Sequence, residues 1–141
     1  MANKDELIQS VKNIVKHWRD GKLADAYAAY GELFSTSDFG EHRPEDQRQA
    51  LKLMILAKGA PDPERPTPEM VEAHRIAAGP LTELVSKYGE PGDHEMLGVC
   101  HIVLGNPESA SAILRAGLAI ERQRNPQSDL CGALMKRISL I

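Results

Sequence analysis

The amino-acid sequence predicts a single all-α domain over residues 1–141, and three observations lead to this prediction. Apolar residues recur every three or four positions along most of the chain, no segment alternates apolar and polar residues as a strand would, and glycine or proline marks nearly every boundary. Apolar residues make up 42% and charged residues 26% of the chain, which is typical of a globular protein. Aromatic residues make up only 4%, which favours aliphatic packing between helices over a sandwich or barrel.

The first part of the chain predicts a helical hairpin. Asn3 and Glu6 have the spacing of a capping box, and an apolar stripe then continues at helical spacing until Gly21. A second stripe covers residues 23–34. Because the linker between them is only about three residues long, the two helices should pack antiparallel. Trp18 lies on the first stripe and is expected in the core.

The middle of the chain predicts two more helices. Residues 35–43 are rich in Ser, Asp and Gly and indicate a loop, after which Pro44 begins a third helix that should end near Gly59. Three prolines in residues 60–66 prevent its continuation. Thr67 is suited to cap a fourth helix that ends near Gly89, and Pro80 is expected to kink or split it.

The last part of the chain predicts three helices. The fifth should be capped by Asp93 and closed by Gly105, the sixth should begin at residues 106–108, and the seventh should cover residues 128–140. No sheet is expected. The predicted architecture is therefore about seven helices, arranged as three antiparallel helix-turn-helix pairs and a C-terminal capping helix.

An internal repeat supports this arrangement. Three residues near the first turn recur at one constant spacing near the fifth: Gly21, Ala26 and Tyr30 correspond to Gly105, Ala110 and Leu114. The glycine allows the chain to turn, the small alanine allows two helices to approach closely, and the large residue one turn later fills the space between pairs. Gly59 lies near the midpoint between the two glycines.

The third predicted pair resembles a tetratricopeptide repeat. Seven of its residues stand at the spacing of that family's large, small, turn and alanine positions: Leu97, Gly98, His101, Gly105, Ala110, Leu114 and Gly117. The first pair matches at Gly21, Ala26 and Tyr30, and the repeat-closing proline is displaced to Pro126. This resemblance implies a TPR-like α-solenoid that acts as a binding scaffold.

The resemblance also indicates which positions would face a ligand. These candidate partner-binding residues are Gln49, Leu53, Leu56, Glu95, Val99 and Ile102. Most are apolar, whereas the family's clamp for a terminal carboxylate uses Lys, Arg and Asn at such places, so that ligand is not expected here. We expect an apolar groove that is filled either by the helix of residues 128–140 or by an amphipathic partner helix.

The sequence predicts no enzyme, cofactor or metal site. It contains no phosphate-binding loop, no nucleophile elbow and no pair of histidines with zinc-protease spacing. His101 is expected to be a packed interior ring and His94 a surface one, and Asp93, His94 and Glu95 could support acid–base chemistry only in a cleft. We therefore predict an interaction module that binds a helical or extended segment of a protein partner. A self-associating structural subunit is the main alternative, followed by a small helical metal-binding protein or enzyme.

Charge and cysteine content limit the partners and the compartment. The net charge of −3 gives no general attraction to nucleic acid, and no apolar run is long enough to span a membrane. Cys100 and Cys131 each lie within an apolar helical pattern, without zinc-site spacing, so both should be buried free thiols. These features predict a cytoplasmic protein whose partner is a protein or peptide, or a second copy of the chain.

Overall fold

The computed structural model describes residues 2–141, and within them the chain is helical with no strand. This confirms the predicted all-α fold class. The helices are α1 (Lys4–Arg19), α2 (Leu23–Ser35), α3 (Pro44–Ile55), α4 (Pro68–Tyr88), α5 (Pro91–Val103), α6 (Pro107–Arg124) and α7 (Asp129–Ser139), with a short 3-10 helix η1 (Phe39–Glu41) between α2 and α3.

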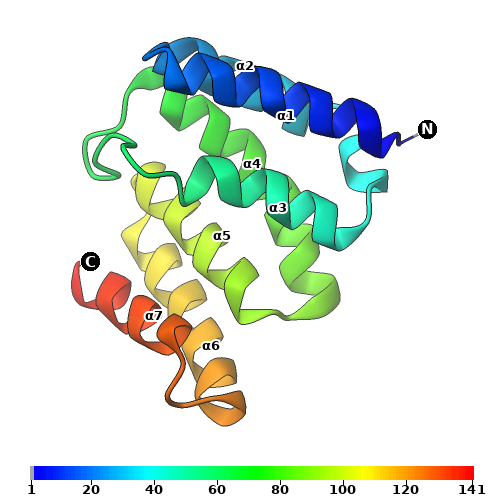
Figure 1. Ribbon diagram of the computed structural model, residues 1–141. Helices are drawn as coiled ribbons and strands as arrows, with labels where there is room; N and C mark the ends of the chain where they lie inside the picture. The colour runs from blue at the N-terminus through cyan, green and yellow to red at the C-terminus, as the bar shows by residue number, and fades with distance from the viewer. Residues whose placement is uncertain (1) are drawn as a thin grey trace.

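The helices pack in succession along the chain, except that α3 lies beside this series. Figure 1 shows α1, α3, α5 and α7 following one another on the near side, with α4 behind α3. Along the chain of contacts, α1 packs on α2, α2 on α4, α4 on α5, α5 on α6 and α6 on α7. The expected hairpins α1–α2 and α5–α6 each have an extensive interface between their two helices. The third expected pair, α3 and α4, shares few contacts. The long linker of residues 56–67 allows α4 to pack between α2 and α5 while α3 lies against α5.

Side-chain caps fix three helix starts. The Asn3 side-chain oxygen accepts hydrogen bonds from the backbone N–H groups of Asp5 and Glu6, at 2.9 and 3.3 Å. Thr67 Oγ1 caps α4 by accepting from the Met70 N–H at 3.2 Å, and Ser128 Oγ caps α7 in the same way. Each cap satisfies a backbone donor that has no partner within its helix.

The repeated glycines form equivalent turns. After α1, the N–H of Gly21 donates to the Trp18 carbonyl at 3.1 Å and the next N–H donates to the His17 carbonyl at 2.9 Å. After α5, the corresponding distances from Gly105 and the residue after it are 3.0 and 2.8 Å. Both glycines have a positive φ, 76° and 77°, which this helix-ending motif requires and a glycine adopts without steric cost. Gly59 also has a positive φ but lies beyond the end of α3.

Two expected boundaries differ from the structure, and the helix that Pro80 was expected to kink or split is not split. The third helix ends at Ile55 rather than near Gly59, and the fifth begins at Pro91, so that Asp93 lies inside its first turn. Helix α4 continues through Pro80. Proline removes one backbone hydrogen bond, but Ala77 and Leu81 are buried on either side of it, and their packing holds the two halves together as one helix.

The core has two parts. The larger cluster extends from α1 to α5. Trp18 packs against it and meets Tyr27 edge-on with ring centroids 5.4 Å apart, but Trp18 is only partly buried and so lies at the edge of the core. The smaller cluster joins α5, α6 and α7 around Leu114 and Leu134. Cys100 and Cys131 are buried free thiols, as predicted, and burial raises the pKa of the Cys100 thiol to about 12.

Candidate functional site

The six candidate partner-binding residues do not form one continuous surface. On α5, Glu95 and Val99 are buried and Ile102 is half-buried. On α3, Gln49 and Leu53 are exposed, and Leu56 directly after this helix is half-buried. The predicted face is therefore covered at α5 and open at α3.

Helix α7 is the element that covers the α5 part. Arg137 on α7 donates from Nε to the Glu95 carboxylate at 2.8 Å, and only 9% of the Glu95 side chain is exposed. Ile102 packs against the apolar cluster that α7 shares with α6, which includes Leu130 and Ile138. Of the two occupants considered for this groove, the C-terminal helix is the one that lies on α5.

The open part is a groove between α1 and α3, which we call the α1–α3 groove. It encloses about 360 Å³ and is lined by Lys4, Leu7, Ile8, Val11, Lys12, Asp46, Gln49, Ala50 and Leu53. Its most prominent apolar side chains are Ile8, 41% exposed, and Leu53, 38% exposed. At one end, Lys4 Nζ lies 3.7 Å from the Asp46 carboxylate. Two of the sequence-predicted residues, Gln49 and Leu53, lie in this groove.

Helix geometry explains why the groove stays open. Leu7 and Ile14 on α1 are buried, whereas Ile8 lies one position further around the helix. On α3 the buried positions include Ala50, Leu51 and Met54, and Leu53 lies outside that stripe. Both helices thus have apolar side chains outside their buried stripes, and these side chains line the groove between the two helices.

A second cavity, which we call the α3–α7 cavity, lies beside the linker of residues 56–67 and encloses about 300 Å³. It contains the predicted residues Leu56 and Val99. It also contains Tyr27, His74 and Arg137, which the sequence pattern did not single out as site residues. The signal was weak because these residues belong to α2, α4 and α7, and each has an ordinary place in its own helical pattern.

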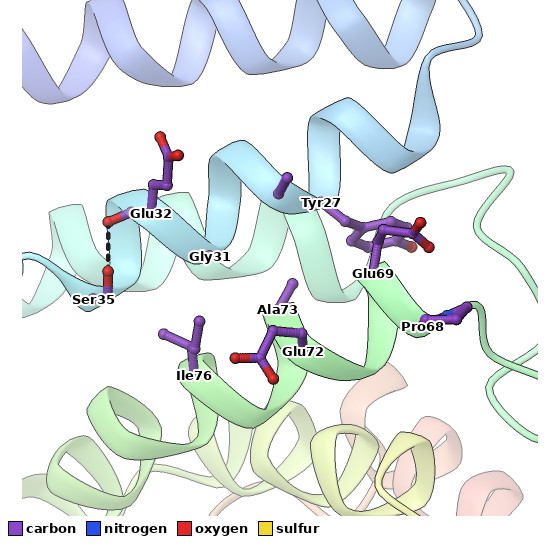
Figure 2. Close-up of a pocket in the computed structure, with 10 residues that line it drawn as sticks. Tyr27, Gly31, Glu32, Ser35, Pro68, Glu69, Glu72, Ala73 and Ile76 are labelled. Atoms are coloured by element: carbon purple, nitrogen blue, oxygen red, sulfur yellow. Dashed lines mark hydrogen bonds between the residues drawn. The ribbon is translucent and has the colours of Figure 1, made fainter.

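A third depression separates α2 from α4 and encloses about 440 Å³. Figure 2 shows Ala73 and Ile76 of α4 directed toward α2, with Glu69 and Glu72 also on α4. Glu32 of α2 lines the depression too, but its carboxylate points away from α4. Gly31 forms part of the floor, where a β-carbon would lie 3.2 Å from Ile76 Cδ1. One of these glutamates already has a partner: the Glu72 carboxylate accepts a hydrogen bond from Arg75 Nε at 2.9 Å.

The expectation for His94 is wrong. His94 is buried and donates from Nδ1 to the Glu90 carbonyl at 2.8 Å, whereas His101 is half-buried and its Nδ1 is buried. His94 is interior because α5 is surrounded on every side near its start, where α6 packs closely against it. Asp93 is also buried, and its carboxylate binds Arg48 at 2.9 Å.

These contacts define what the Asp93–Glu95 segment does. Both carboxylates are held in ion pairs with arginines of other helices, and neither lines the grooves described above. Among residues 2–141, no group of three His, Cys, Asp or Glu side chains is placed to hold a metal ion. The segment therefore joins α5 to α3 and α7 in this fold.

Comparisons with known proteins give no match for this chain. It matches no protein-family model, and neither curated proteins nor solved structures give a significant match. In the part of the chain that the structure describes, no helix combines the length and apolar content needed to cross a membrane. The all-α fold and the geometry of the grooves are thus the basis for assigning a function.

Proposed function

We propose that this chain is a non-enzymatic, TPR-like interaction module that binds an amphipathic helical segment of a protein partner in the α1–α3 groove. The observation that carries this proposal is the pair of exposed aliphatic side chains, Ile8 and Leu53, on either side of an apolar groove. Partner helices dock in such grooves through apolar residues spaced at i, i+3 and i+4.

The energetics favour binding at this groove. Fully burying a leucine or isoleucine side chain is worth about 1.5–3 kcal/mol, so burying the remaining two fifths of Ile8 and Leu53 is worth about 0.5–1 kcal/mol each. Leu7, Val11 and Ala50 form the floor, and Gln49 offers an amide that can bond a polar group at the rim. Helix α7 already occupies the α5 part of the face, which leaves the α1–α3 groove as the open part.

Two features of the wider chain agree with this proposal. The equivalent turns at Gly21 and Gly105 support a repeat of helix pairs, which is the basis of the TPR-like description. The two buried free thiols support a reducing compartment, and we propose that the protein acts in the cytoplasm.

Site-specific photo-cross-linking tests the proposal. A benzophenone amino acid is placed at position 53 in the groove, or at position 135 on α7, where Met135 is similarly exposed. We expect a discrete protein adduct from position 53 that is absent from position 135. Equal adducts from both positions, or none from position 53, would contradict binding in the groove.

Charge substitutions give an independent measurement. Leu53→Asp should abolish capture of the cross-linked partner, because it places a carboxylate where apolar surface is to be buried, whereas Met135→Asp should not. Circular dichroism checks that both variants remain folded. Size-exclusion chromatography with light scattering addresses self-association: a wild-type dimer that Leu53→Asp converts to a monomer would replace the adaptor proposal with a self-associating subunit.

A further inference from the structure

The α3–α7 cavity has a feature that the α1–α3 groove lacks, because it combines apolar walls with polar groups that have unused hydrogen-bonding capacity. Its apolar lining includes Met54, Leu56, Met70 and Val99, and Pro61 and Pro63 of the linker form another wall. Prolines restrict the backbone of such a wall, so a ligand meets a surface that is already ordered.

The hydroxyl of Tyr27 is the first unused group. Tyr27 is 1% exposed, and its hydroxyl has no hydrogen-bond partner within residues 2–141. Leaving a buried hydroxyl unpaired is unfavourable, and most such groups in proteins have a partner. Burial raises the pKa of Tyr27 to about 12, so the hydroxyl keeps its proton. The hydroxyl has almost no accessible surface, so it donates to a ligand only after a small movement of the Tyr27 ring toward the cavity.

His74 supplies an acceptor in the same cavity. Its Nδ1 donates to the Met70 carbonyl at 2.8 Å, which leaves the lone pair on Nε2. Burial lowers the pKa of His74, so the ring is neutral near pH 7 and Nε2 can accept a hydrogen bond. The His74 and Tyr27 rings lie with their centroids 6.0 Å apart.

Arg137 is the basic side chain that lines the cavity. Its Nε is bound to Glu95, and within the described residues its two Nη groups have no hydrogen-bond partner. The Nη edge of a guanidinium presents two parallel N–H donors, which match the two oxygens of a carboxylate. Glu95 offsets the charge of Arg137 but does not occupy this edge.

We propose that the α3–α7 cavity binds a small organic acid with an apolar body, whose carboxylate pairs with Arg137 while the apolar body lies among the methionines and prolines. A polar substituent at the inner end would bond the Tyr27 hydroxyl and His74 Nε2. The volume of about 300 Å³ lies at the lower end of the range for small-molecule sites, which favours a compact molecule. This site is independent of the partner groove proposed above.

Titration with benzoate, followed by the amide NMR signals of the full chain, tests this inference. We expect saturable shifts at Gly59 and His74 with a Kd of about 1 mM or tighter, and binding of the neutral isostere benzamide at least about tenfold weaker. 4-Hydroxybenzoate should bind more tightly than benzoate, and Tyr27→Phe should remove that difference.

Matched variants identify the basic group. Replacing Arg137 and Glu95 together with glutamine avoids leaving Glu95 buried without its partner, and we expect this double variant to weaken benzoate binding at least about tenfold. Arg124→Gln serves as the control, because Arg124 pairs with Glu90 on the surface and does not line the cavity. It should leave the affinity unchanged.

Three results would overturn the inference. The first is the absence of saturable shifts, and the second is equal affinity of the double variant and the wild type. The third is clustering of the shifts at Gly31 and Ile76, because Tyr27 also lines the depression between α2 and α4, and such shifts would place benzoate there instead.

Discussion

Substituting Gly117 with alanine should destabilise the protein, because α5 and α6 approach each other closely at this position. A β-carbon built on Gly117 would lie 2.6 Å from the His94 Cβ and 3.1 Å from its Cγ. Carbon atoms pack best at about 3.5–4.0 Å, so α6 would have to move away from α5 by about 1 Å, or the His94 backbone would have to shift.

The size of the effect follows from two opposing contributions. Overpacking of a close contact typically costs about 1–3 kcal/mol, whereas replacing a mid-helix glycine with alanine contributes about 0.5–1 kcal/mol of stability. Gly132 isolates the second contribution, because it lies within α7, no proline follows it, and a β-carbon there would meet no atom within 4 Å. We therefore expect Gly132→Ala to stabilise the fold and Gly117→Ala to reduce the free energy of unfolding by about 0.5–2 kcal/mol.

Urea denaturation followed by circular dichroism measures both variants against the wild type. The difference between the two alanine variants gives the overpacking cost with the helix propensity removed, and it should be about 1–3 kcal/mol. If Gly117→Ala is as stable as Gly132→Ala, the α5–α6 contact does not require a residue without a side chain, and the reasoning is refuted.

Three further predictions concern the repeat, the last helix and pH. Ala110→Leu should lower the melting temperature through an overpacking cost of about 1–3 kcal/mol, because Ala110 is fully buried, whereas Ala112→Leu on the exposed side should have little effect; equal melting temperatures would remove the physical basis of the repeat alignment. Truncation after Asn125 should cause aggregation or a lower melting temperature, because it uncovers Leu114 and leaves Glu95 without Arg137; an unchanged, monomeric product in size-exclusion chromatography would contradict the covering role of α7. Burial lowers the pKa of His74 in the fold, so the unfolded chain binds a proton more readily, and the free energy of unfolding should fall as the pH drops below about 6.5 and level off below the folded pKa. His74→Gln should flatten this part of the stability profile measured by denaturation, and a slope identical to that of the wild type would contradict the assignment.

Local chemistry makes several features of this fold predictable from short stretches of sequence. The caps at Asn3, Thr67 and Ser128 act within three residues of the chain, and the turns at Gly21 and Gly105 are closed by bonds within five residues. Each is encoded in a short segment, so the sequence is sufficient to identify it. The same applies to the buried stripes, because helical spacing places their members on one side of a helix.

The candidate site is harder to predict, because it depends on how distant helices meet. A helical pattern shows that Glu95, Val99 and Ile102 share one side of α5, but it does not show that α7 lies on that side. The same pattern does not show that Leu53 is left beside Ile8, since the two residues belong to different helices.

The sequence by itself thus determined the helical class, the starts of the capped helices and the two glycine turns, since these depend on backbone preferences and on bonds between near neighbours. The tertiary structure alone decided that α5 is enclosed, that His94 is interior and that Tyr27, His74 and Arg137 meet in one cavity. The physical reason is that burial and pairing are set by contacts between helices far apart in the chain. These contacts depend on how the helices cross, and the long linker of residues 56–67 lets α3 and α4 pack in different places.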